Sequence, residues 1–281
     1  MGILLKKTRV IAYGKLKTDK VDSYYLAQLL RIGFLPMSYP YSYEEKSLKS
    51  LCRFYFQFLC RFRAMIKQDL RSLLSINLLK IKKRDILGKS SIEELKKISL
   101  DSIYYEIRKK IDIELGLTLD EIIKETKKIL ENYAQNDKDV CLLATLPGMS
   151  LLSALAIKLE LGSFERVPSA KSLVNFIGLR PFLYQSGNKV YSGKIIKEGH
   201  KFLRSLYFQA AIKITPKNAP QLWQMYLRLI NKGKPKILAR VAIARKLAVI
   251  SWHMMRKKQP FYPYYASSSE SLTQSRRMFL V

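Results

Sequence analysis

The sequence predicts a mainly α-helical protein, and three observations support this fold class. Residues 44–81 contain no glycine or proline and carry apolar residues at helical spacing. Residues 91–133 are rich in Lys, Glu, Ile and Leu, with apolar positions three and four apart. Two further basic helices are predicted at 200–214 and 235–256. Apolar residues that recur every three or four positions turn one face of a helix toward a core.

The first 43 residues predict a short strand, a helix and a loop. β-branched and apolar residues at 3–13 favour the strand. The segment TDKVDSYYLAQLLRIG, residues 18–33, predicts a capped helix that ends at Gly33. The proline- and tyrosine-rich segment PMSYPYSY follows, and it predicts a loop that ends near Tyr43.

The two long helical segments permit two interpretations. Stretches such as LTLDEIIKETKKILENYA, residues 117–134, have the pattern of an antiparallel or coiled-coil arm. Ordinary solvated helices explain the same pattern equally well. The residues alone therefore leave both structures open.

The composition of the sequence changes after Asp139. Pro147 and Gly148 separate two apolar helical stretches, and residues 176–199 form a glycine-punctuated segment that predicts a loop. The two basic helices follow. The serine-rich tail, residues 266–281, predicts disorder.

The net charge of the chain is the feature that best indicates its binding partner. The chain has 51 Lys and Arg against 22 Asp and Glu, a net charge of +29. From Asn136 onward there are 24 basic and 6 acidic residues. A polyanion such as nucleic acid explains this excess, because cationic side chains that neutralise phosphates release condensed counterions. An anionic membrane surface is the competing partner, but no basic amphipathic anchor stands out.

From the same composition we expect neither a membrane-spanning segment nor a secretory signal. No apolar run approaches the roughly 20 residues that a bilayer span needs, and the N-terminus is too short and too charged for a secretory signal. The three cysteines, Cys52, Cys60 and Cys141, lack metal-ligand spacing. They predict free thiols in a reducing cytoplasm.

The segment Leu146–Ser150 resembles the hairpin of a helix-hairpin-helix. Gly148 permits a tight turn, and backbone N–H groups near Ser150 at the following helix start can hold a DNA phosphate. A plain turn between two helices is the alternative. The sequence leaves both open.

Asp19 and Asp22 are two carboxylates three positions apart at a helix start. On one face they could bind Mg²⁺, a hard cation that takes carboxylate, water and phosphate ligands. As an N-cap and a first-turn residue, they would instead stabilise the helix dipole. Spacing alone favours this second role.

Ser186 precedes Gly187 in a basic segment. Its hydroxyl could be presented to a phosphodiester, with Lys189, Lys194 and Lys197 stabilising developing negative charge. A polar surface loop explains the same residues, and a lone Ser-Gly pair favours that simpler interpretation. A Ser-His-Asp hydrolase is unlikely, because acidic companions for His200 are almost absent in this half of the chain.

Three segments together resemble a known family. They are KTDKVDSYYLAQLLRIGFLP, then LLATLPGMSLLSALAIKLELGSFERVPSAKSLVNFIGLRP, then YQSGNKVYSGKIIKEGHKFLRSLYFQAA. In this order they resemble insertion-sequence family 110, the Piv/MooV-type DEDD transposases, with PGMS where PGIG is usual. The resemblance covers residues 17–43 and 142–262.

The resemblance implies an architecture and a chemistry. Residues 1–45 would be the remnant of an α/β RuvC-like domain, 46–135 a helical arm, and 136–265 the C-terminal transposase domain. Asp19 and Asp22 match the last two of four acids that hold Mg²⁺, and Ser186 matches a nucleophilic serine. The family implies DNA, a noncoding bridge RNA and further copies of the chain as partners.

The candidate residues for nucleic-acid contact share a basic or backbone-donor character. They are Gly148, Ser150, Lys189, Lys194, Lys197, Lys201, Arg204, Arg240, Arg245 and Lys246.

The chain departs from the family pattern before Lys17. Family members have a strand with an Asp and then a Glu there, whereas these sixteen residues contain no acid. We therefore expect an N-terminally truncated transposase of bacterial cytoplasm and nucleoid, with weak or no activity of its own. A non-enzymatic basic DNA- or RNA-binding protein is the alternative. A helical scaffold would explain the arm but not the charge.

Overall fold

A computed structural model describes most of the chain. The described residues are 23–24, 27–28, 30–31, 40–79, 85–186, 189–195 and 199–262. The chain divides into two compact units, Met1–Ser47 and Leu48–Val281. In the first unit, the six described residues of the predicted helix 18–33 are all helical. The predicted strand at 3–13, Asp19, Asp22 and the tail 266–281 lie outside the described residues.

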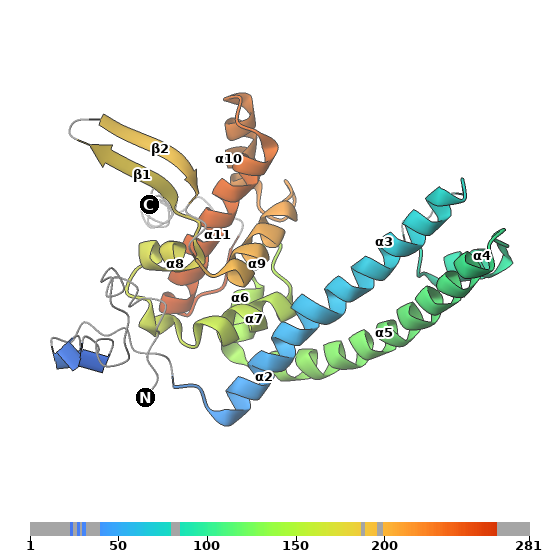
Figure 1. Cartoon of the computed structure of the whole chain (residues 1–281). Helices are drawn as coiled ribbons and strands as arrows, with labels where there is room; N and C mark the ends of the chain where they lie inside the picture. The colour runs from blue at the N-terminus through green and yellow to red at the C-terminus, as the bar shows by residue number, and fades with distance from the viewer. Residues whose placement is uncertain are drawn as a thin grey trace. The chain divides into compact units, whose positions relative to one another are not determined.

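Helices make up most of the described chain (Figure 1), which confirms the predicted mainly α-helical class. The elements are α2 (Tyr43–Phe54), a π-helical turn η3 (Tyr55–Leu59), α3 (Cys60–Ile76), α4 (Lys89–Lys97), α5 (Ile103–Gln135), α6 (Lys138–Ala144), α7 (Leu151–Leu161), a 3-10 turn η4 (Phe164–Arg166), α8 (Ala170–Ile177), β1 (Pro181–Ser186), β2 (Lys189–Ile195), α9 (Lys201–Ile212), α10 (Pro220–Asn231) and α11 (Lys236–Lys257).

The first long helical segment is one continuous helix with a π-helical turn in its middle. The residues on both sides of η3, Phe54 and Cys60, keep right-handed helical backbone angles. The helix therefore runs from Tyr43 to Ile76, close to the predicted 44–81.

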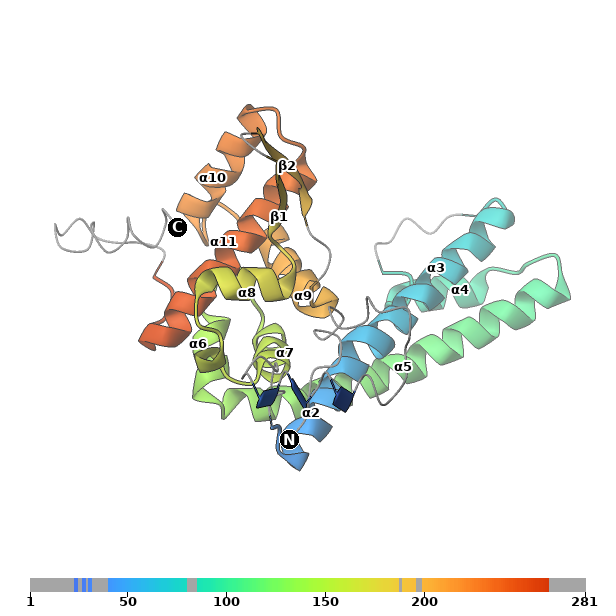
Figure 2. The same ribbon diagram turned by 60° about the vertical axis from the view of Figure 1, so that its left-hand side comes forward.

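Helices α3 and α5 form an antiparallel pair, which we call the arm. They lie side by side in both views (Figures 1 and 2). Arg63 of α3 pairs with Asp120 of α5, and Asp69 of α3 pairs with Arg108 of α5. The residue numbers of the paired side chains increase along α3 and decrease along α5. The two helices therefore run in opposite directions. The structure thus selects the antiparallel arrangement from the two that the sequence left open.

Helices α6 to α11 form a cluster around α11. Helix α11 packs against α6, α8, α9 and α10, and much of its circumference is buried, including Ile243, Leu247 and Ile250. Helix α7 is also buried almost all round, as expected of a helix that is apolar on every face. Inside the cluster, the hydroxyl groups of Tyr207 and Ser251 form a 2.8 Å hydrogen bond.

The predicted loop at 176–199 is wrong, because much of this segment is an antiparallel hairpin. Strand β1 pairs with β2 in a register that sets Leu183 opposite Ser192 and Ser186 opposite Lys189. Aromatic and β-branched residues on both sides of a Ser-Gly-Asn sequence favour two short strands. The glycines of this segment had suggested a loop. Strands instead lie on both sides of position 187, and Gly193 lies within β2.

Candidate nucleic-acid interface

The hairpin register places Ser186 at the end of the ladder farthest from α8 and α9. Pro181 and Ile195 pair at the end nearest those helices, and Ser186 and Lys189 pair at the other. Lys194 lies near the base of β2, and Lys197 lies outside the described residues. Among the described residues, the backbone therefore brings Ser186 beside Lys189, and it places Lys194 near the other end of the ladder.

Two glycines and two hydrogen bonds hold the base of the hairpin. A Cβ added to Gly199 would lie 2.4 Å from the nitrogen of Gly178, so this close approach requires glycine. The His200 N–H donates to the carbonyl of Phe176 at 2.9 Å. The Arg204 guanidinium donates to the carbonyl of Ile177 at 3.1 Å. Arg204, a predicted nucleic-acid contact, thus has a structural role at the end of α8.

A buried carboxylate lies beneath this base. The side chain of Glu160 in α7 is 2% exposed, and its oxygens pair with Arg53 (2.7 Å), Lys49 (3.3 Å) and Nε2 of His200 (3.1 Å). Burial alone would raise the pKa of Glu160. The hydrogen bonds with His200 and Arg53 and the positive charges of Lys49 and Arg53 outweigh burial and lower the pKa to about 2. Glu160 therefore stays ionised and joins α2, α7 and the start of α9.

The sequence did not suggest Glu160, and the expectation that His200 has almost no acidic companion is wrong, because Glu160 pairs with it. The signal that could have found Glu160 is a single acid inside an otherwise apolar stretch, LLSALAIKLEL, of a basic region. A carboxylate that is buried in such a helix needs partners, because an unpaired buried charge is very costly.

The turn around Gly148 packs against α9. Gly148 has a φ of +77°, and a Cβ there would lie 2.3 Å from the carbonyl oxygen of Ala210. Ser150 is exposed and caps α7 by accepting a hydrogen bond from the Ser153 N–H at 3.2 Å. The fold therefore needs glycine at position 148 for its own packing. Phosphate binding by this turn stays a prediction.

The predicted contacts on α11 mostly point into the cluster. Arg240 donates to the carbonyl of Ala211 at 2.6 Å and lies 4.1 Å from the ring centre of Tyr226. Lys246 is 7% exposed, and burial lowers its pKa. Arg245 is half-buried. Binding roles for these three residues stay predictions. The contacts of Arg240 already join α11 to the end of α9 and to α10. Lys201, at the start of α9, is exposed.

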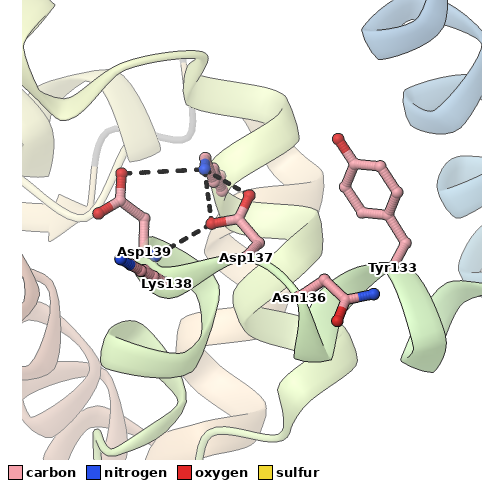
Figure 3. Close-up of a pocket in the computed structure, with 6 residues that line it drawn as sticks. Tyr133, Asn136, Asp137, Lys138 and Asp139 are labelled. Carbon is pink, nitrogen blue, oxygen red and sulfur yellow. Dashed lines mark hydrogen bonds and ion pairs between the residues drawn. The ribbon is translucent and has the colours of Figure 1, made fainter.

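A pocket of about 590 Å³ lies where α5 meets α6 (Figure 3). Asp137 accepts hydrogen bonds from the N–H groups of Asp139 and Val140 at the start of α6. Lys158 approaches Asp137 Oδ1 to 2.7 Å, and Lys258 approaches Asp139 Oδ1 to 2.7 Å. These lysines neutralise the two carboxylates, so the cluster joins α6 to α7 and to the end of α11.

The described residues also bear on metal and membrane sites. Among them, no three His, Cys, Asp or Glu side chains gather as a metal centre would require. Within the same residues, every helix is too short or too polar to cross a bilayer.

Part of the C-terminal cluster matches a known protein family. The model of the IS116/IS110/IS902 transposase family matches residues 140–227. Over 121 residues, or 43% of this chain, the sequence is 34% identical to the pilin gene-inverting protein of Moraxella bovis, of which the match covers 38%. Over 147 residues, or 52% of this chain, it is 28% identical to the transposase for insertion sequence element IS1111A of Coxiella burnetii, of which the match covers 40%.

A third relative gives the same result. Over 135 residues, the chain is 28% identical to the transposase for insertion sequence element IS1328 of Yersinia enterocolitica, of which the match covers 40%. The matched segment thus spans about two fifths of the length of these curated relatives. The match at residues 140–227 includes the second and the third of the motifs that first suggested this family. Residues 140–227 of this chain are therefore similar to the transposase domain of the IS116/IS110/IS902 family.

Proposed function

We propose that this protein binds duplex DNA and belongs to the machinery that cleaves and rejoins DNA strands at an insertion sequence. The observation that carries the proposal is the family match at residues 140–227, which includes the hairpin with Ser186. The charge supports it, since residues 136–281 hold 24 basic and 6 acidic side chains.

Ser186 is the residue we assign to the covalent step. Its hydroxyl oxygen would attack a DNA phosphate, form a phosphoserine link and displace a deoxyribose oxygen. A serine hydroxyl is a poor nucleophile until a base or a metal activates it. Asp19 and Asp22 would hold Mg²⁺, which supplies charge stabilisation at a phosphate when bound. Lys189, paired with Ser186 in the hairpin register, would add positive charge.

Two further partners belong to the proposal. A noncoding bridge RNA would share the basic half of the chain, because its backbone offers the same phosphates. Further copies of the chain would associate through the arm. Its helix α5 exposes Ile107 (50%), Ile111 (50%) and Leu115 (45%), which recur every four residues on one face. We expect the protein at the bacterial nucleoid.

The experiment is to trap a covalent protein–DNA adduct. The full chain would be incubated with Mg²⁺, insertion-sequence end DNA and its flanking RNA, then denatured and resolved by electrophoresis. We expect a weak adduct, in keeping with the weak activity expected from the sequence, and Ser186→Ala should abolish it. Ser192→Ala is the matched control, because Ser192 also precedes a glycine on the same hairpin.

An adduct that persists in Ser186→Ala would show that the serine assignment is wrong. DNA binding without any adduct would instead favour the alternative function, a non-enzymatic basic DNA- or RNA-binding protein.

A further inference from the structure

Five exposed lysines lie at two places, just after the end of α9 and around the turn that joins α10 to α11. We call them the lysine surface: Lys213, Lys217, Lys232, Lys234 and Lys236. None of them was among the residues expected to contact nucleic acid. The residues that were expected on α11 are largely buried, so this surface offers the positive charge that those residues do not.

Arg240 brings the parts of the lysine surface together. It donates to the carbonyls of Ala211 (2.6 Å) and Ile214 (3.4 Å), at the end of α9. Its guanidinium also lies over the rings of Tyr226 and Trp223 in α10. The contacts of this half-buried side chain therefore hold the end of α9, helix α10 and the first turns of α11 beside one another.

Acidic residues are scarce in the part of the sequence that carries the lysine surface. From Arg166 to Tyr262 the only acidic residue is Glu198. Within the described part of the chain, none of the five lysines has an ion-pair partner, in contrast to Lys158 and Lys258. Surface lysines that lack partners repel one another unless an anion lies between them. Their charge is thus available to a polyanion.

The α10–α11 turn is exposed, so a groove of a nucleic-acid duplex could receive it. In both views it lies at the end of the C-terminal helices away from α6 and α7 (Figures 1 and 2). A Cβ added to Gly233 in this turn would meet no atom within 4 Å, so the turn is open to solvent. The first turn of α11 exposes Ile237 (69%) and Leu238 (53%). The major groove of duplex DNA is wide enough for a helix, and the deep major groove of duplex RNA is not.

We propose that the lysine surface binds the phosphate backbone of duplex DNA, with the start of α11 in or beside the major groove. Lys232, Lys234 and Lys236 lie beyond residue 227, so this contact extends past the segment that matches the family. The inference rests on the proposed DNA binding and names the part of the molecule that performs it.

The test compares two triple variants of the full chain that lose the same charge. One is Lys232→Gln, Lys234→Gln and Lys236→Gln. The matched control is Lys124→Gln, Lys127→Gln and Lys128→Gln, three exposed lysines of α5. Affinity for a labelled DNA duplex is measured from about 50 to 200 mM salt. Circular dichroism checks that both variants are folded.

Each lost phosphate contact lowers the slope of log K against log salt by about 0.9. We therefore expect the α10–α11 triple variant to lose roughly 2–3 units of slope and about 100- to 1,000-fold in affinity at 100 mM salt. The α5 triple variant should keep the wild-type slope. Equal effects of the two variants, or no effect of the first, would overturn the assignment of the surface.

An RNA duplex of the same sequence separates the two nucleic acids. A larger loss of affinity for RNA than for DNA in the α10–α11 variant would overturn the choice of DNA. A wild-type chain that binds DNA with no salt dependence would instead contradict the proposed function itself.

Discussion

Arg53 in α2 and Glu160 in α7, 107 positions apart, form a two-bonded ion pair, with Nη2 and Oε2 at 2.7 Å. The same carboxylate accepts a hydrogen bond from Nε2 of His200, the N-cap of α9, beside the base of the hairpin. This single side chain therefore joins the long N-terminal helix to the part of the fold that carries Ser186. The carboxylate and its partners come from three elements, α2, α7 and the start of α9, so the arrangement forms only when those elements are packed together.

We predict that Glu160→Gln destabilises the fold. The change removes the negative charge with which Lys49 and Arg53 pair. Breaking a fully buried ion pair on one side costs roughly 3–5 kcal/mol, and the cost here is smaller because the Arg53 side chain is 48% exposed. Urea unfolding followed by circular dichroism measures the loss. Glu131→Gln is the control, because its pair with Lys127 is exposed and is worth about 1 kcal/mol or less. Equal stability of the two variants would show that the Glu160 pairs contribute nothing.

Asp112 in the arm should make stability depend on pH. Burial raises the pKa of Asp112 to about 6, and the neighbouring Asp69 carboxylate adds to the rise. Among the described residues, its Oδ2 has no hydrogen-bond partner. A raised pKa means that the stabilisation is full below the ordinary value near 4 and is lost as the pH rises through 6. The ionised carboxylate therefore weakens the arm at pH 8.

The variant Asp112→Asn imitates the protonated carboxyl. We expect its melting temperature at pH 8 to exceed that of the wild type by about 2–4 °C. The difference should shrink as the pH falls from 7 to 4. Asp101→Asn, an exposed acid near the start of α5, should match the wild type throughout. A difference between Asp112→Asn and the wild type that does not change with pH would contradict the raised pKa.

Gly148→Ala should destabilise the fold more than Gly233→Ala. Both glycines have a positive φ, +77° and +75°, so both variants suffer backbone strain of roughly 1–2 kcal/mol. Only the Gly148 variant also drives a methyl group against the carbonyl of Ala210, whereas Gly233 is surrounded by open space. Thermal unfolding compares them directly. Equal melting temperatures would mean that α9 moves freely away from the turn.

The arm should mediate self-association. The double variant Ile107→Lys and Ile111→Lys places charge on the exposed apolar face of α5 and should shift the protein toward monomer. Light scattering after size-exclusion chromatography measures the mass. The control, Lys110→Gln with Glu114→Gln, changes exposed polar residues of the same helix and should not alter the mass. A wild-type protein that is monomeric throughout the micromolar range would rule out association through the arm.

The sequence predicted the helices well because periodicity is a local property. The segment 44–81 corresponds to one helix from Tyr43 to Ile76. The hairpin was missed because glycines at both of its ends suggested a loop. The roles of Arg240 and Lys246 depend on which face of α11 is buried, and a basic helix reveals that face only when its neighbours are known. The Glu160 cluster joins residues more than a hundred positions apart, which no local pattern encodes.

The salt dependence of DNA binding tests the central claim most directly. The full chain would be titrated against a DNA duplex of arbitrary sequence between about 50 and 200 mM salt. If roughly 6–10 phosphates are neutralised, affinity should fall by about 10³–10⁵ over this range. Sequence changes in the duplex should matter little, because phosphate contacts do not read bases. An affinity that stays constant across the same salt range would contradict the account of this protein as an electrostatic DNA binder.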